Sequence, residues 1–323
     1  MAWQLNAAGT SDSGLGLYPM PGTGVFMRRE PVGLLLVGKR GRYELIPDDL
    51  EEVLERADGT SSLYELARSA GRAPEEVASK VLWLSSLAEQ GFLELRRYPS
   101  AQARGLRVSA YRPFSDDAFS SPMYASLAIT SVCNRDCAHC FRKGAERCRE
   151  LDTTTLIGII RGLSDLRLVE LNITGGEPTL HRDFAEIIAA ACGVIAGVSL
   201  STNGTLLFPD RVDALLSAGV HCVQIGLNAL FDDRSGSDEG MERIVEGARA
   251  LLEGGAEVTL AAVLTRSIID DLDEVERLGE MIRPAQLRIG PLIGCHEGVR
   301  MCMPERERMR DAILELRRWS RRT

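Results

Sequence analysis

Residues 124–140 read YASLAITSVCNRDCAHC, an apolar run followed by three cysteines, Cys133, Cys137 and Cys140. The run is typical of a buried strand, and the thiols follow directly at its carboxyl end. Four cysteines would fill the coordination of a zinc ion or of a four-iron cluster, whereas three leave one metal position open. The spacing alone therefore leaves a structural metal site and a reactive one as alternatives.

Further strand patterns, each followed by a helical pattern, continue along the chain. They read VELNIT (169–174), VSLSTNG (198–204), CVQIGLNA (222–229), VTLAAVLT (258–265) and LRIGPL (287–292). Such alternation predicts an α/β fold with a parallel sheet covered by helices. Six units are too few for a closed eight-fold barrel, so residues 124–323 are expected to form a partial (β/α)6 TIM-like barrel or a doubly wound sheet.

Polar motifs also end the second and third predicted strands. Gly175 and Gly176 permit close approach of a ligand to the backbone, and Glu177 can accept hydrogen bonds from an ammonium group. Ser201 and Asn203 lie in the segment STNG, where ordinary turn chemistry is an alternative explanation. Because the carboxyl ends of parallel strands meet at one rim, we expect the thiols, the carboxylate and the amide to converge there.

With these motifs in this order, residues 124 to about 320 resemble the radical S-adenosylmethionine (SAM) superfamily. That family has a C-x3-C-x-Φ-C motif after its first strand, with Φ usually aromatic, and a GGE-type motif after its second. The resemblance implies that Cys133, Cys137 and Cys140 hold a [4Fe–4S] cluster whose fourth iron is chelated by the amino and carboxylate groups of SAM. An electron from the cluster would break the sulfonium bond, and the resulting 5′-deoxyadenosyl radical would abstract hydrogen from the substrate.

The resemblance also implies which side chains and turns contact SAM. His139 occupies the Φ position near the adenine, where Phe or Tyr is more frequent. Ser201 and Asn203 are expected to contact the ribose or the carboxylate of SAM. Gly175, Gly176 and Glu177 are expected to hold its methionine ammonium group, and Arg266 to pair with its methionine carboxylate.

A different pattern precedes the barrel. A lead-in rich in Gly, Ser and Pro (1–23) and a linker rich in Pro and Ser (99–123) flank residues 24–98, where short strands and three helices predict a small α+β, winged-helix-like unit. The third helix, at 74–91, begins at Pro74 and is closed by Gly91. Its predicted apolar face consists of Val77, Val81, Leu82, Leu84, Leu87 and Ala88.

Residues 24–98 resemble the PqqD-like peptide-recognition domain, through ADGTSSLYELARSAG and EEVASKVLWLSSLAEQGFLEL. In that fold a leader peptide adds as a strand to the sheet edge, against the third helix. A winged-helix DNA-binding domain, or a domain that merely packs, is the alternative. The segment is not basic, which argues against DNA.

Composition limits the remaining choices. The net charge is −8, no stretch approaches the ~18–20 apolar residues of a membrane span, and the N-terminus lacks a signal pattern, so we expect a cytoplasmic protein. No cysteine precedes Cys133, which argues against a disulfide scaffold. Cys295 and Cys302 alone cannot hold an auxiliary Fe–S cluster, so the chain is either truncated before a cysteine-rich extension or lacks one. Auxiliary ligation by these two cysteines, with His296 as an extra ligand, is kept as the lesser alternative.

The sequence therefore predicts a radical SAM enzyme that modifies a ribosomally made precursor peptide, bound through its leader, by a crosslink, epimerisation or oxidation. An electron donor such as flavodoxin or ferredoxin is implied. One alternative is a radical SAM enzyme acting on a small molecule, an RNA or a protein such as a glycyl-radical partner. The other is a non-catalytic, metal-binding winged-helix regulator.

Overall fold

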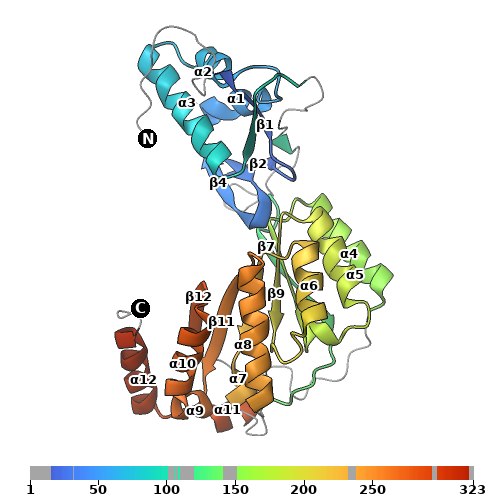
Figure 1. Cartoon of the computed structure of the whole chain (residues 1–323), viewed down its shortest axis with the longest axis vertical. Coiled ribbons are helices and arrows are strands. Elements are labelled where there is room, and N and C mark those ends of the chain that lie inside the picture. The colour runs from blue at the N-terminus through green and yellow to red at the C-terminus, as the bar shows by residue number, and fades with distance from the viewer. Residues whose placement is uncertain are drawn as a thin grey trace. The chain divides into compact units, whose positions relative to one another are not determined.

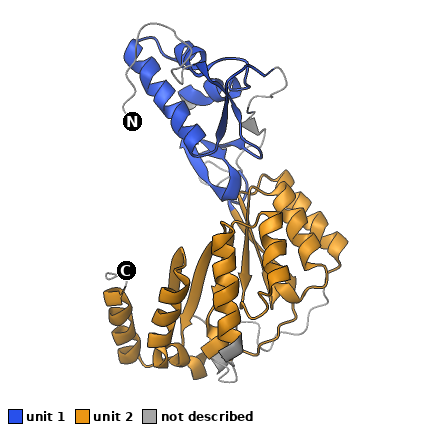
Figure 2. Cartoon of the chain, in the orientation of Figure 1, with its two compact units in different colours: residues 1–123 blue, residues 124–323 orange. Residues whose placement is uncertain are grey.

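The computed structural model describes residues 16–31, 33–100, 106, 108–109, 120–140, 151–231, 238–292 and 297–319. Two compact units divide the chain, residues 1–123 and residues 124–323 (Figure 2). Within the described residues, no helix has both the length and the apolar character needed to cross a membrane.

The described part of unit 1 (residues 1–123) contains two small sheets. A four-stranded sheet has the order β4-β3-β2-β6 and consists of β2 (Phe26–Glu30), β3 (Gly33–Val37), β4 (Tyr43–Ile46) and β6 (Val108–Ser109). A two-stranded sheet pairs β1 (Tyr18–Pro21) with β5 (Leu93–Arg96). The first sheet shares an apolar core with α1 (Glu51–Glu55), α2 (Leu63–Ala70) and α3 (Pro74–Glu89).

Helix α3 begins and ends as its sequence predicts, but its apolar face is narrower. Pro74 lies in the first turn, and Gly91 adopts a left-handed conformation with φ 81° just beyond the end. Leu84 and Leu87 are fully buried, whereas Leu82 is 59% exposed, so its assignment to the apolar face is wrong. Two helical positions differ by about 200° around the axis, which places Leu82 opposite Leu84.

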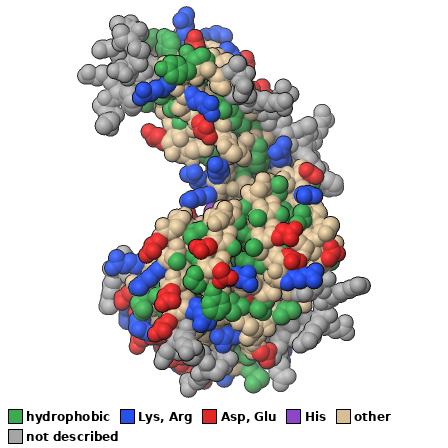
Figure 3. All heavy atoms as spheres, turned by 45° about the vertical axis from the view of Figure 1, so that its right-hand side comes forward, with side chains coloured by type: hydrophobic (Ala, Val, Ile, Leu, Met, Phe, Trp, Pro, Cys, Tyr) green, Lys and Arg blue, Asp and Glu red, His purple; other side chains and the backbone are tan. Residues whose placement is uncertain are grey.

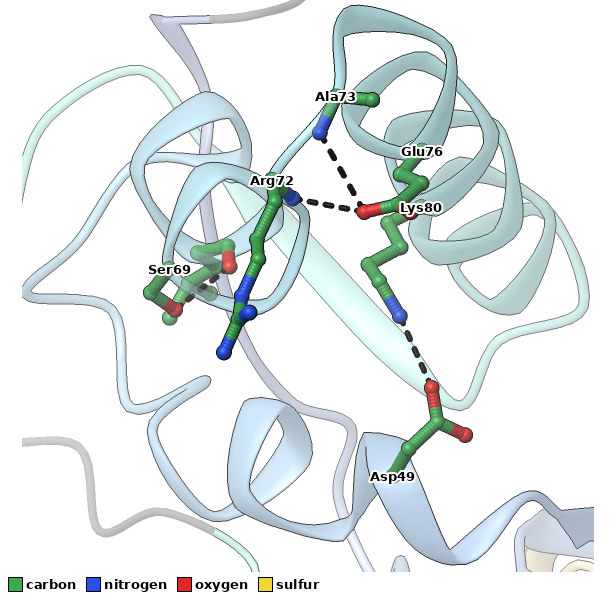
Figure 4. Close-up of polar contacts among 7 residues, drawn as sticks. Asp49, Ser69, Arg72, Ala73, Glu76 and Lys80 are labelled. Carbon is green, nitrogen blue, oxygen red and sulfur yellow. Dashed lines mark hydrogen bonds and ion pairs between the residues drawn. The ribbon is translucent and has the colours of Figure 1, made fainter.

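Polar contacts tie α3 to its neighbours (Figure 4). The carboxylate of Glu76 accepts hydrogen bonds from the backbone N–H groups of Arg72 (2.7 Å) and Ala73 (3.4 Å), which satisfies donors at the helix start. Lys80 Nζ lies 3.1 Å from Asp49 Oδ2. Because Asp49 belongs to the turn that follows β4, this ion pair connects α3 to the end of that strand (Figure 4).

Two segments expected to be irregular contribute to unit 1. The flexible lead-in predicted at 1–23 includes β1, a short strand on a sheet edge, where Pro19 is tolerated because an edge strand needs fewer N–H donors. The linker predicted at 99–123 includes β6, which pairs with β2. Farther along, Ser120 donates hydrogen bonds from its backbone N–H (2.5 Å) and its hydroxyl (2.8 Å) to the buried carboxylate of Glu30 on β2.

Unit 2, residues 124–323, is a parallel sheet wrapped by helices (Figure 1). Its strand order β12-β11-β10-β9-β8-β7 follows the chain without a reversal. This order confirms the partial (β/α)6 barrel and excludes the doubly wound sheet, in which the order reverses. The strands are β7 (Tyr124–Thr130), β8 (Glu170–Gly175), β9 (Gly197–Thr202), β10 (Cys222–Gly226), β11 (Glu257–Leu264) and β12 (Gln286–Pro291).

Helices cover one side of this sheet (Figure 1). The larger ones are α4 (Thr153–Asp165), α5 (Phe184–Val194), α6 (Pro209–Ala218), α8 (Asp238–Glu253), α10 (Leu272–Ile282) and α12 (Arg306–Trp319). Short segments η4 (Pro178–Leu180), α7 (Asn228–Phe231), α9 (Arg266–Asp270) and α11 (Glu297–Cys302) lie between them in the chain. Figure 3 shows acidic and basic side chains interspersed over the face of unit 2 that it draws.

The two sides of the sheet differ in chemistry because alternate strand residues point to opposite sides. Leu171, Leu200 and Val223 point to the helices and belong to the apolar core. On the open side, Ser201 Oγ donates to Asn172 Oδ1 (3.1 Å), and Asn172 Nδ2 donates to the exposed Ser126 Oγ (3.1 Å). A chain of polar side chains therefore crosses β9, β8 and β7 on the open side.

Candidate functional site

The cysteine loop, residues 131–140, follows β7 directly. Cys133 is exposed, while Cys137 and Cys140 are half-buried, and all three are free thiols. The backbone N–H of Cys140 donates to the carbonyl of Cys137 at 3.1 Å, which forms a tight turn. His139 lies half-buried within this turn, beside two of the thiols.

The end of β8 is joined to the start of this loop by its backbone. The N–H of Gly176 donates to the carbonyl of Thr130 (2.9 Å), and the N–H of Glu177 donates to that of Val132 (2.8 Å). A Cβ at Gly175 would lie 2.4 Å from the Thr130 carbonyl oxygen, and one at Gly176 would lie 2.2 Å from that of Val132. The close approach that requires these glycines is thus made by the chain itself, whereas the sequence argument assigned it to a ligand.

Glu177 is buried, and its carboxylate is already hydrogen-bonded within the protein. Oε1 accepts from the Thr179 N–H (3.2 Å), the Thr179 hydroxyl (2.6 Å) and the Thr202 hydroxyl (2.8 Å), and Oε2 accepts from the Asn203 N–H (2.8 Å). These bonds connect the end of β8 to the end of β9. The contact between Glu177 and an ammonium group stays a prediction, and the structure gives this carboxylate a connecting role.

The other predicted contacts lie at separate places on the rim. Ser201 belongs to the polar chain on the open side of the sheet, through Asn172. Asn203 lies just after β9 and contacts the cysteine loop, because its Nδ2 donates to Asn134 Oδ1 at 2.8 Å. Arg266 begins α9 after β11, two strands from β9, and its Nε donates to the Met303 carbonyl at 2.9 Å.

Asn134 and Thr205 were not predicted at this rim from the sequence, and Thr202 was expected there through its hydroxyl but without an assigned partner. Thr202 reaches the carboxylate of Glu177, and Thr205 contacts both Asn134 and Asn203. The polar segment from 201 to 205, which follows a buried strand, was the available signal. It did not reveal the partners, because they lie on other strands.

The surroundings of the Cys133 thiol raise its pKa above the ordinary value. Desolvation raises its pKa, and the charges of Glu177 and Cys140 add to the rise. Hydrogen bonds from the Arg135 backbone and the Asn203 side chain act in the opposite direction. A bound metal would override these effects, because a coordinating thiol is deprotonated outright.

Three thiols on one loop form a donor set that fits a four-iron cluster with one open iron. Among the described residues, no three side chains of His, Cys, Asp or Glu converge to hold one metal ion. In a four-iron cluster each thiolate binds its own iron, so the three free thiols of this loop are the number that leaves one iron open. Of the predicted auxiliary ligands, Cys302 lies half-buried in α11, and Cys295 and His296 lie outside the described residues.

A comparison with protein-family models now bears on this rim. Residues 127–279 match the model of the Radical SAM superfamily, and this range contains every residue predicted to hold the cluster or SAM. Residues 127–279 are a radical SAM domain. The cofactors of such a domain are a [4Fe–4S] cluster and SAM, and the superfamily is one of enzymes.

Curated relatives of the radical SAM domain are named as enzymes of two kinds. A probable GTP 3′,8-cyclase of Methanosarcina acetivorans is 31% identical over 170 residues, which are 49% of this chain and 50% of that protein. The mycofactocin maturase MftC of Mycolicibacterium smegmatis is 32% identical over 177 residues, 52% of this chain and 45% of that protein. The chain thus spans about half the length of these curated relatives.

Solved structures extend the likeness of the fold beyond the radical SAM domain. SuiB of Streptococcus suis, bound to S-adenosylmethionine, matches 94% of this chain and 68% of its own with a TM-score of 0.60 at 14% identity. SuiB bound to the precursor peptide SuiA matches 92% of this chain and 69% of its own, also with a TM-score of 0.60, at 16% identity. At such low identity, the likeness concerns the fold alone.

Proposed function

We propose that this protein is a radical SAM enzyme that modifies a precursor peptide, and that unit 1 is a PqqD-like domain that captures the leader of that peptide. The observation that carries the proposal is a free sheet edge in unit 1, in a chain that continues into a radical SAM domain. An unpaired edge strand presents backbone N–H and C=O groups to which an extended peptide can hydrogen-bond as an added strand.

Strand β4 forms this edge. Within the described residues it pairs with β3 alone, so no strand occupies the other side of its backbone there. Tyr43 is 58% exposed and Leu45 is 52% exposed, on the same side of the strand, while Ile46 points into the core. An added peptide strand would place alternate apolar side chains beside Tyr43 and Leu45.

The comparisons support a peptide substrate by analogy. MftC is named a maturase, and SuiB has been solved with its precursor peptide SuiA. When bound, the cluster and SAM supply the radical that abstracts hydrogen from the substrate. The chain itself would bind the cluster through Cys133, Cys137 and Cys140, and would hold the peptide in reach of the rim. The proposed electron donor is a flavodoxin or a ferredoxin.

The experiment uses the full chain, reconstituted with iron and sulfide without oxygen. A candidate precursor peptide, taken from a short neighbouring reading frame, is incubated with SAM and a chemical reductant, and the peptide mass and 5′-deoxyadenosine are measured. A modified peptide together with 5′-deoxyadenosine is expected, and Cys137→Ala should abolish both while Cys192→Ala, a core thiol, should not. Cleavage of SAM without any peptide binding would overturn the peptide assignment, and absence of iron uptake would support the regulator instead.

A nucleotide substrate is the second candidate, because the probable GTP 3′,8-cyclase aligns with the same domain. The same reconstituted protein would be incubated with GTP, SAM and reductant. A GTP-derived product formed without any peptide would favour this candidate over the first.

A further inference from the structure

Asn134, Asn203 and Thr205 form a closed ring of hydrogen bonds between the cysteine loop and the end of β9. Asn134 Nδ2 donates to Thr205 Oγ1 (2.9 Å), Thr205 Oγ1 donates to Asn203 Oδ1 (2.7 Å), and Asn203 Nδ2 donates to Asn134 Oδ1 (2.8 Å). Each side chain therefore donates one bond and accepts one bond within the ring. Such closed arrangements are cooperative, since each bond polarises the next.

The ring connects a metal-binding segment to a rigid part of the fold. Asn134 immediately follows Cys133, whereas Thr205 is 4% exposed in the turn after β9. The backbone of this turn is held in addition, because the Asn203 N–H donates to Glu177 Oε2 (2.8 Å) and the Thr205 N–H donates to Asn203 Oδ1 (3.0 Å). The ring thus anchors Cys133 through its neighbour to two strand ends.

The amide of Asn203 has little capacity left for a ligand. Its Oδ1 accepts from both the N–H and the hydroxyl of Thr205, and an amide oxygen has two lone pairs. Its Nδ2 donates to Asn134, and its side chain also donates toward the thiol of Cys133. The oxygen and the NH2 group of the Asn203 side chain are therefore already used by protein partners, and these are the atoms that would have to bind a nucleoside.

From this geometry we infer that Asn134, Asn203 and Thr205 are positioning residues, which fix the first half of the cysteine loop for cluster binding, and that Asn203 serves the loop and not the SAM ribose or carboxylate. The inference concerns the radical SAM domain alone. It stands whether the substrate is a peptide or a nucleotide.

The test measures loop order and cluster retention in place of turnover. In the metal-free full chain, backbone hydrogen exchange of residues 131–135 is followed by mass spectrometry. In the reconstituted protein, the rate of iron loss to a chelator is followed without oxygen. Asn134→Ala, Asn203→Ala and Thr205→Val should each accelerate both processes by about 2- to 10-fold, the range for one lost hydrogen bond.

Matched variants separate the ring from a general loss of stability. Thr205→Ser keeps the hydroxyl and should restore both rates. Thr259→Val makes the same change as Thr205→Val at another 4% exposed threonine, which lies on β11 and contacts Cys222 on β10, and should leave both rates unchanged. The double variant Asn134→Ala with Asn203→Ala should be no faster than the faster single variant, because either change opens the same ring.

Binding of SAM to the reconstituted protein distinguishes positioning from ligand contact. A positioning role requires Asn134→Ala and Asn203→Ala to change SAM affinity by similar factors. Two results would overturn the inference. One is weaker SAM binding in Asn203→Ala alone, with loop exchange unchanged, and the other is unchanged exchange and iron loss in both Asn134→Ala and Thr205→Val.

Discussion

The backbone N–H of Glu177 donates to the carbonyl of Val132 at 2.8 Å. This hydrogen bond joins the turn after β8 to the loop after β7. The pairing of β7 with β8 continues in this way past the ends of both strands. The pairing of the parallel strands therefore fixes the position of the first residues of the cysteine loop. The two glycines before Glu177 permit the close backbone contact on which this position depends.

Replacement of Gly176 should disturb the cluster loop directly. Gly176→Ala would place a Cβ 2.2 Å from the Val132 carbonyl oxygen, and the backbone must separate to accept it. We expect a loss of about 1–3 kcal/mol in the free energy of unfolding, together with reduced iron content after reconstitution. Denaturant unfolding and iron analysis measure the two effects.

Gly158→Ala is the control for this substitution. Gly158 lies in α4 with no atom within 4 Å of the added Cβ, so the change should be neutral or should stabilise the helix by roughly 0.5–1 kcal/mol. Equal iron content in both glycine variants would contradict the role assigned to Gly176.

Glu177 should behave as a structural connection between β8 and β9 even without any cofactor. Glu177→Gln replaces one acceptor oxygen by an NH2 group, so one of the donors from Thr179, Thr202 or Asn203 loses its partner in a buried place. A buried donor that loses a charged acceptor costs about 1.5–3 kcal/mol, and urea unfolding of the metal-free protein should show a loss in this range.

Glu253→Gln, at the exposed end of α8, provides the comparison for Glu177→Gln. It should stay within about 0.5 kcal/mol of the parent chain. Should both variants unfold alike, the connection from Glu177 to β9 would have no energetic weight.

The free edge of unit 1 predicts where leader binding is sensitive. Leu45→Glu places a charge on the exposed side of β4, where the proposed peptide would lay apolar side chains. Fluorescence anisotropy with the labelled peptide should show a Kd raised by at least about tenfold, with little change in the melting temperature. Tyr98→Ser, which alters a 79% exposed tyrosine beyond β5, should bind as the parent does; weakening by both changes would speak against an edge-specific site.

Acid should weaken unit 2 through the start of α4. Hydrogen bonds from the backbone and then the hydroxyl of Thr155 lower the pKa of Asp152 below its ordinary value. The folded state therefore binds this proton less readily than the unfolded state, so the stabilisation is present above about pH 4 and is lost as the pH falls further. The melting temperature of Asp152→Asn, which keeps an oxygen acceptor but does not titrate, should fall less steeply between about pH 5 and pH 3; parallel curves would refute this.

Much of unit 2 was predictable because its signals are local. The apolar strands, the cysteine spacing and the glycine pair each occupy consecutive positions, and strand ends follow from topology. Partners across the sheet were not predictable: Thr205 precedes α6, Asn134 follows β7, and their contact depends on how β9 packs beside β8. In unit 1, the helical spacing of apolar residues wrongly placed Leu82 on the buried face of α3. The strand β1 was not recognised because the segment around it is rich in Gly and Pro.

The polar chain from Ser126 through Asn172 to Ser201 has a calorimetric consequence. A molecule that binds against these three polar side chains removes less apolar area from solvent than one that binds an apolar surface, so its binding there should carry a smaller heat-capacity change. A strand that covers Tyr43 and Leu45 would instead give a clearly negative one. Calorimetric titrations of a full-length substrate at several temperatures give its heat-capacity change of binding. The size of that change indicates whether the substrate binds at the edge of unit 1 or at the barrel.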